Sequence, residues 1–138
     1  MKNTNIKVIT FGVFDVFHYG HLRLFKNIKK HIGENCFLTV CVQDSDTILK
    51  YKPESKVVYT TEERVEIIKN LRCVDDVKIY TDIDKDIQEI DFDIWVKGPD
   101  QCHAGFQRAI EWCKQNNKQV EVIQRTEGVS SSYLKSLK

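Results

Sequence analysis

The stretch IKVITFGVFDVFHYGH, residues 6–21, joins a strand-like run to the start of a helix, and it decides the fold. Residues 6–10 are mostly β-branched, which predicts a strand that ends near Gly12. Beyond His21, apolar side chains recur at helical spacing with basic side chains between them, which predicts an amphipathic helix. The apolar positions are Leu22, Phe25, Ile28 and Ile32, and the basic ones are Arg23, Lys26, Lys29 and Lys30.

Strands and helices alternate along the rest of the chain. Four further strands are predicted, at residues 36–42, 74–80, 94–96 and 120–123. Helices are predicted after a Thr60-x-x-Glu63 capping box, over residues 104–116, and briefly after Ser130. Residues 44–59, which are rich in lysine, are expected to be irregular. This alternation predicts βαβ units, and therefore a single doubly wound α/β domain with a parallel five-stranded sheet over residues 1–138.

The overall composition is that of an ordinary globular domain. Of 138 residues, 41% are hydrophobic and 30% are charged, and the net charge of +1 does not indicate a surface for nucleic acid. No apolar run approaches the roughly 20 residues that a membrane span requires, and the first residues lack the apolar centre of a signal peptide. We therefore expect a cytoplasmic protein without membrane or nucleic-acid partners.

The five cysteines show no metal-binding or disulfide spacing. They are odd in number and scattered without a C-x-x-C pair, so we expect reduced thiols. A zinc- or redox-sensing site would have to use Cys102, His103 and Cys113, which only their proximity supports.

Two histidines follow the first strand, where doubly wound sheets bind their ligands. If the helix begins near Gly20, His18 and His21 lie in its first turn, beside backbone N–H groups that attract anions. Gly12 and Gly20 would let the backbone approach a phosphate closely. The alternatives are a plain helix cap, with Phe14 and Phe17 packing in the core, and a metal site formed by both histidines with Asp15.

Three motifs resemble those of the cytidylyltransferase-like nucleotidyltransferases. Gly12-Val-Phe-Asp-Val-Phe-His-Tyr-Gly-His21 resembles the signature G-x-F-D-x-x-H-x-G-H, which binds the triphosphate in that family. Arg125-Thr-Glu-Gly-Val-Ser-Ser-Ser132 is similar to R-T-E-G-I-S-T-S, and Arg72-Cys-Val-Asp-Asp-Val77 to R-Y-V-D-E-V. The resemblance covers nearly the whole chain and is closest to the single-domain glycerol-3-phosphate cytidylyltransferases. It implies a Rossmann-like nucleotidyltransferase fold and transfer of CMP from CTP to a phosphorylated alcohol, which yields a CDP-alcohol and pyrophosphate.

The resemblance also implies roles for individual residues, Mg²⁺ as cofactor, and a homodimer. The implied catalytic residues are His18, His21, Lys52 and Arg125. The implied nucleotide-binding residues are Thr10, Phe11, Gly12, Val13, Phe14, Asp15, His18, Gly20, His21, Lys50, Lys97, Asp100, Arg125, Thr126, Gly128 and Ser130. The implied acceptor-binding residues are Lys50, Lys52, Arg64 and Arg72. The alternative for both arginines is a surface ion pair, and the alternative for both lysines is a solvated loop. Asp15 would orient groups or support Mg²⁺, which would be held mainly by the phosphates of CTP.

The chain departs from the family pattern in places that affect the acceptor. Val13 stands where the glycerol-phosphate enzymes have threonine, and Cys73 replaces a tyrosine. The loop from Pro99 to Phe106 replaces their G-D-D-W and G-K-F segments, so the identity of the acceptor stays open. The alternatives are cytidylyl or adenylyl transfer to another phosphate or phosphonate, and a nucleotide-binding module without turnover.

Overall fold

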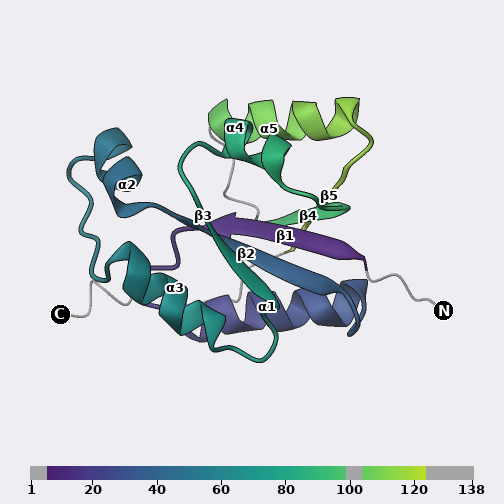
Figure 1. Ribbon diagram of the computed structural model, residues 1–138, viewed down its shortest axis with the longest axis horizontal. Helices are drawn as coiled ribbons and strands as arrows, with labels where there is room; N and C mark the ends of the chain where they lie inside the picture. The colour runs from purple at the N-terminus through teal and green to yellow at the C-terminus, as the bar shows by residue number, and fades with distance from the viewer. Residues whose placement is uncertain (1–5, 99–103, 124–138) are drawn as a thin grey trace.

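The computed structural model describes residues 6–98 and 104–123 as a three-layered α/β domain (Figure 1). All five strands are parallel, in the order β3-β2-β1-β4-β5. The elements are β1 (Lys7–Gly12), α1 (Tyr19–Ile32), β2 (Phe37–Gln43), α2 (Ser45–Tyr51), α3 (Thr61–Lys69), β3 (Asp76–Tyr80), α4 (Ile83–Asp86), the 3₁₀ turn η1 (Ile87–Glu89), β4 (Ile94–Lys97), α5 (Ala104–Gln115) and β5 (Gln119–Val122). The predicted doubly wound sheet is confirmed.

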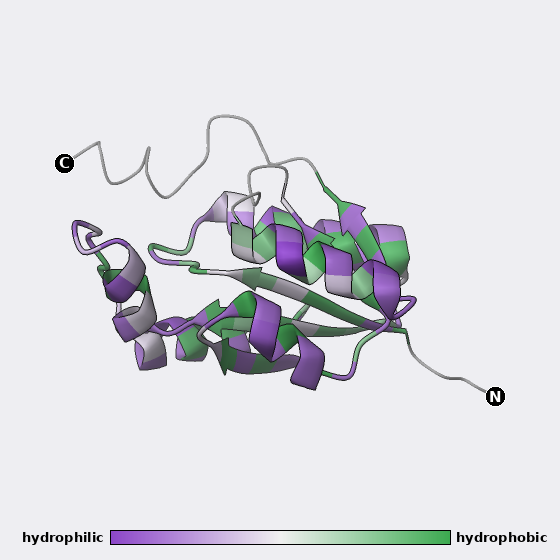
Figure 2. Cartoon of the chain, turned by 90° about the horizontal axis from the view of Figure 1, so that it is seen from above, coloured by the Kyte–Doolittle hydropathy of each residue, from purple (hydrophilic) through white to green (hydrophobic). Residues whose placement is uncertain are grey.

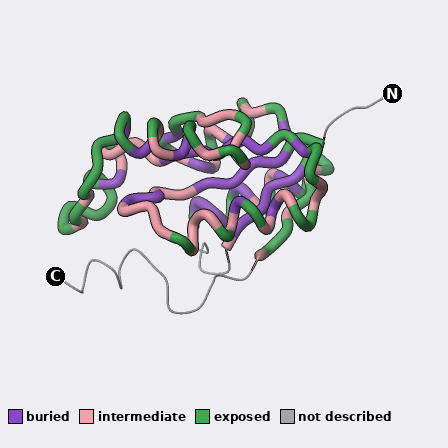
Figure 3. The backbone as a smooth tube through the Cα atoms, turned by 90° about the horizontal axis from the view of Figure 1, so that it is seen from below, coloured by how far each residue is buried: buried purple, intermediate pink, exposed green. Residues whose placement is uncertain are grey.

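Successive side chains of the inner strands β1, β2 and β4 enter two separate cores, one on each face of the sheet. Val8 packs with residues of α1 and α3, whereas Ile9 packs with residues of α4 and α5. Accordingly, α1 and α3 lie below the sheet in Figure 1, and α4 and α5 lie above it. Apolar colours follow the inner strands of the sheet in Figure 2, and the middle of the sheet is the most buried part of the described chain in Figure 3.

The structure adds two helices that the sequence analysis did not predict. Helix α2 lies within residues 44–59, where we expected irregular structure; Asp44 caps it by accepting the N–H of Thr47. Helix α4 has four residues, which is too short to show an apolar period. The expected short helix after Ser130 lies outside the described residues.

The carboxyl ends of the strands meet at one edge of the sheet, and the segments that leave this edge build the site. Residues 13–18 connect β1 to α1, Asp44 connects β2 to α2, and β4 ends at Lys97. Across the described ranges, no helix combines the length and apolarity that crossing a bilayer requires.

Candidate active site

The β1–α1 loop, residues 13–18, has a strained backbone. Phe14 has φ = 55° and Val16 has φ = 49°, values that L residues rarely adopt and that are least favourable for a β-branched side chain. Such strain is typical of functional loops, and it persists only where surrounding contacts over-determine the conformation.

Gly12 ends β1 directly under the ring of Phe14. A Cβ atom at Gly12 would lie 2.7 Å from Phe14 Cζ and 2.8 Å from Cε2, which is closer than real Cβ atoms approach. The Phe14 ring also packs edge-on against Phe25 and His21. Glycine is therefore required at position 12 to fit Phe14, rather than only to admit a ligand.

His18 and His21 cap helix α1 reciprocally. Nδ1 of His18 accepts the N–H of Gly20 at 3.0 Å, and Nδ1 of His21 accepts the N–H of His18 at 3.3 Å. The two rings stack with 3.7 Å between their centroids. Because each Nδ1 acts as an acceptor, the neutral tautomer of both rings carries its proton on Nε2. The cap thus makes each Nε2–H the donor of its ring.

This cap corrects one step of the sequence analysis. We expected backbone N–H groups at the start of α1 to be available to an anion, but those of His18 and Gly20 donate to imidazole nitrogens. The N–H groups of His21 and Leu22 donate to the carbonyl oxygen of His18. Both Nδ1 atoms therefore act as helix caps, as the plain-cap alternative stated. Only the Nε2 atoms of the two histidines are left for a role in catalysis.

Several side chains expected at the nucleotide lie in the core instead. Thr10 and Phe11 are each 1% exposed, and the Phe11 ring packs edge-on against Tyr80 and Trp95. Phe14 is 7% exposed. In this structure these buried side chains support the site through core packing, and only the backbone groups of these residues could contact a ligand.

Asp15 is a buried anchor for a distant segment. Its carboxylate oxygens accept the N–H of Val58 at 2.7 Å and the N–H of Tyr59 at 2.9 Å. Asp15 is only 3% exposed. As placed here, its carboxylate orients protein groups, which was one of our two expectations; the other, support of Mg²⁺, stays a prediction.

Arg64 was expected at the acceptor phosphate, but the structure buries it completely. Its guanidinium donates to the carbonyl oxygens of Val13 and Gln43 at 2.8 Å each, and to Ser45 Oγ at 2.7 Å. Burial lowers the pKa of Arg64 from its usual value, and the charge of Asp15 partly offsets this. Since these donors point to protein acceptors, the guanidinium as placed here serves the fold. The alternative of a surface ion pair is excluded by the same burial.

Lys50 and Lys52 lie at the carboxyl edge, on exposed positions at the end of α2. Nζ of Lys50 lies 5.6 Å from the centroid of the Tyr51 ring, and the Tyr51 hydroxyl donates to Asp82, which follows β3. The end of α2 is thereby fixed beside β3, with both lysines accessible from solvent.

Lys97 ends β4 at the same edge and is 7% exposed, with Nζ 3.1 Å from the carbonyl oxygen of Gly98. The remaining residues of the expected site lie outside the described residues. They are Asp100, Cys102, His103, Arg125, Thr126, Gly128 and Ser130.

The third motif lies at the opposite edge of the sheet. Arg72 precedes β3, whose first residue, Asp76, pairs with Thr39 at the amino end of β2. Asp75 Oδ2 accepts Lys29 Nζ at 2.7 Å and the N–H of Leu38 at 2.8 Å. Within one chain, therefore, the structure does not bring Arg72 to the histidines, and its expected role in holding the acceptor stays a prediction.

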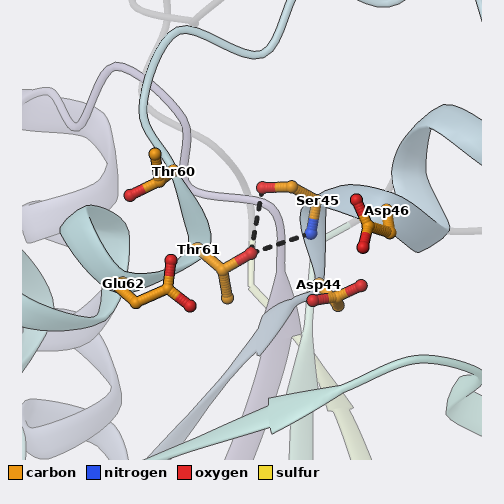
Figure 4. A pocket seen from close by; sticks show the side chains of 6 residues that line it. All are labelled: Asp44, Ser45, Asp46, Thr60, Thr61 and Glu62. Carbon is orange, nitrogen blue, oxygen red and sulfur yellow. Dashed lines mark hydrogen bonds between the residues drawn. The ribbon is translucent and has the colours of Figure 1, made fainter.

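A polar pocket of about 270 Å³ opens between the starts of α2 and α3 (Figure 4). Its lining residues are Asp44, Ser45, Asp46, Thr60, Thr61 and Glu62. Thr61 Oγ1 accepts the N–H of Ser45 and donates to Ser45 Oγ. We did not predict that these hydroxyls join α2 to α3. The cap at Asp44 was the available sequence signal.

Among the described residues, no three His, Cys, Asp or Glu side chains gather as metal ligands. Asp15 and the two histidines thus do not form a ready metal site. Cys36, Cys41, Cys73 and Cys113 form no disulfide among the described residues, and burial raises the pKa of each thiol, to about 12 for Cys41 and about 11 for Cys113. Such thiols are protonated near neutral pH, which argues against redox sensing through Cys113.

Comparisons with known proteins match almost the full chain. The family model described as cytidylyltransferase-like matches residues 9–137. Glycerol-3-phosphate cytidylyltransferase of Bacillus subtilis is 30% identical over 132 residues, which is 94% of each chain. FAD synthase of Thermococcus kodakarensis is 35% identical over 103 residues, which covers 72% of this chain and 66% of that protein.

A solved structure confirms the fold independently. The crystal structure of the lipopolysaccharide core biosynthesis protein from Thermoplasma volcanium superposes with a TM-score of 0.68 at 24% identity, over 88% of this chain and 96% of that one. The parallel sheet, with paired histidines after its first strand, and the matched relatives define a nucleotidyltransferase-type enzyme. The chain belongs to the cytidylyltransferase-like family.

Proposed function

We propose that this protein transfers a cytidylyl group from CTP to a phosphorylated small alcohol, with sn-glycerol 3-phosphate as the first choice. The observation that carries the proposal is the reciprocal cap, which gives two stacked imidazoles Nε2–H donors at the carboxyl edge of the sheet. Near-complete coverage by the glycerol-3-phosphate cytidylyltransferase of Bacillus subtilis supports the choice of nucleotide and acceptor.

The proposed step is an in-line displacement. An oxygen of the acceptor phosphate attacks the α-phosphorus of CTP and forms the new P–O bond. The bond from the α-phosphorus to the bridging oxygen breaks, and pyrophosphate leaves with its electron pair. Because the acceptor brings its own nucleophile, the protein has to position both substrates and balance negative charge.

His18 and His21 donate Nε2–H bonds to the triphosphate in this proposal, and Lys50 and Lys52 approach the phosphates from the end of α2. Lys97 ends β4 at the same edge, two residues before Pro99 in the sequence. The remaining proposed nucleotide contacts rest on the resemblance alone. They are Asp100, Arg125, Thr126, Gly128 and Ser130.

Mg²⁺ is part of the proposal as a partner of the CTP phosphates. The described residues offer it no cluster of ligands, and both Asp15 oxygens accept backbone N–H groups. We therefore derive no protein-held metal step. The homodimer and the cytoplasmic location likewise remain predictions.

The match to FAD synthase supports a second candidate, nucleotidyl transfer from ATP or CTP to a different acceptor. The two candidates are separated by pyrophosphate release with Mg²⁺, measured for each of four nucleoside triphosphates against a panel of phosphorylated alcohols, phosphonates and FMN. Release with CTP and sn-glycerol 3-phosphate is the expected result. Release only with ATP, or release with CTP only when a different acceptor is present, would replace the first candidate by the second. If no pyrophosphate is released with any combination in the panel but CTP binds in calorimetry, the protein is a nucleotide-binding module without turnover.

A further inference from the structure

A buried arginine and a buried aspartate join the β1–α1 loop to distant segments of the chain, and the catalytic proposal uses neither of them. Arg64 is 0% exposed and Asp15 is 3% exposed. Burying a charge is costly unless hydrogen bonds satisfy it, and an apolar core residue would often stabilise a fold as well. The cost indicates that the pair specifies one particular arrangement of the chain.

Arg64 joins segments that are far apart in the sequence. Its Nη1 donates to the carbonyl oxygens of Val13 and Gln43, at the ends of β1 and β2. Its Nε donates to the carbonyl oxygen of Tyr59 at 3.4 Å. Three segments at the carboxyl edge are thus tied to one planar group, whose fork geometry a lysine does not reproduce.

Asp15 completes a closed circuit through Tyr59. The N–H of Tyr59 donates to Asp15 Oδ1 at 2.9 Å, while the carbonyl oxygen of the same residue accepts Arg64 Nε. Arg64 in turn holds Val13, two residues before Asp15. The circuit brackets Phe14, whose φ is 55°, and lies next to Val16, whose φ is 49°. These hydrogen bonds hold the loop in its strained conformation, which would otherwise relax.

We propose that Arg64 and Asp15 act as one positioning unit, which sets the β1–α1 loop so that His18 and His21 are aligned and ties that loop to the segment following Lys52. The proposal rests on the proposed function for its catalytic consequence only. Val58 and Tyr59 lie six and seven residues after Lys52, and their N–H groups bond to Asp15. The positions of the histidines and of the lysine segment are thus coupled through one carboxylate.

Amide hydrogen exchange tests the positioning without any assay of activity. Asp15→Asn should speed amide exchange at Val58 and Tyr59, whose N–H groups bond to the Asp15 carboxylate. It should also speed exchange by 10-fold or more at His18 and Gly20, whose N–H groups bond to imidazole nitrogens instead. Ile87→Ala is the control, since it removes a fully buried side chain from the other core and lowers global stability without touching the circuit. Unchanged exchange at His18 and Gly20 in Asp15→Asn, relative to Ile87→Ala, would overturn the proposal.

Val58→Pro provides a second variant that leaves the buried charges in place. Val58 is 55% exposed, and proline at this position deletes one N–H donor to Asp15. The same direction of change at His18 and Gly20 is expected, and its absence would again contradict the coupling. If Asp15→Asn does not fold, this variant decides.

Kinetics then test the catalytic consequence. Arg64→Lys should lower kcat by about 10-fold or more while Ile87→Ala, at equal or greater loss of thermal stability, keeps kcat within about 3-fold. Equal kcat losses in both variants would overturn the positioning role. If the wild-type protein shows no turnover with any substrate, the proposed function fails, but the exchange experiment still decides on the positioning unit.

Discussion

The imidazole rings of His18 and His21 stack at 3.7 Å between centroids, and each Nδ1 accepts a backbone N–H at the start of α1. One pair of contacts thus ends the loop, starts the helix and selects the Nε2–H tautomer of both rings. The structural and the chemical roles use different nitrogens of the same rings. Substitutions can therefore separate them.

His18→Asn should keep the helix cap and remove the Nε2–H donor. Asparagine is among the best N-cap residues, so the free energy of unfolding should stay within about 0.5 kcal/mol of wild type, whereas His18→Ala should lose about 1 kcal/mol. Both variants should lose about 10²-fold in kcat if the imidazole stabilises the transition state. Urea unfolding and steady-state kinetics measure the two effects.

His21→Gln is the matched substitution on the other ring, because glutamine at the third helical position completes a capping box. It should also unfold like the wild type and turn over more slowly. Wild-type kcat in both His18→Asn and His21→Gln would remove the histidines from the mechanism and leave them as caps.

The fold was predictable because its signals are local and periodic. The β-branched run before Gly12 and the apolar stripe through Phe25 and Ile28 fix β1 and α1, and the Thr60 capping box marks α3 correctly. Helix α2 was missed because its seven residues bury only Ile48. Asp44 is a typical N-cap residue and could have indicated the start of this helix, but the lysine-rich composition of the segment favoured a loop.

The site was less predictable, since its partners come from distant segments. Asp15 bonds to backbone N–H groups 43 and 44 residues away, and backbone donors leave no trace in residue type. Arg64 lies in a helix start rich in glutamate, which indicates a surface, yet its acceptors are carbonyl oxygens and hydroxyls of a buried junction. Only the three-dimensional arrangement shows that both charged side chains join segments far apart in the sequence.

Gly12→Ala should destabilise the protein by about 1–3 kcal/mol, because the new Cβ would meet the Phe14 ring at 2.7 Å. Combining it with Phe14→Leu should restore part of the loss relative to the sum of the single changes. Gly33→Ala is a useful comparison, as its φ of 141° imposes backbone strain with no contact within 4 Å of the new Cβ. Additive losses in the double variant would show that the ring contact is not the cause.

Asp75→Ala should lower stability and spare activity. Asp75 Oδ2 accepts both Lys29 Nζ and the N–H of Leu38 at the amino edge of the sheet, so its loss should cost about 1–3 kcal/mol. Both kcat and KM should stay within about 2-fold, since the histidines lie at the other edge. Asp76→Ala, which removes the neighbouring carboxylate, should cost less. A rise in KM for Asp75→Ala but not for Asp76→Ala would indicate that the motif at residues 72–77 contributes to substrate binding.

Stability should fall in alkaline solution because of Cys41. Burial raises the pKa of its thiol from 9.0 to about 12, so between these values the unfolded chain loses a proton that the native protein keeps. The thiol's contribution is fully present below pH 9 and is lost as pH rises toward 12, with a slope of up to about 1.4 kcal/mol per pH unit. Burial also raises the pKa of Tyr80, which contributes in the same direction at higher pH.

Urea unfolding at pH 8.0 and at about 10.5, for wild type and Cys41→Ala, measures the difference in pH dependence. The variant should be less stable at pH 8.0 because of its cavity, yet lose less stability on going to the higher pH; parallel losses in the two proteins would show that the Cys41 thiol ionises as readily in the native state as in the unfolded one.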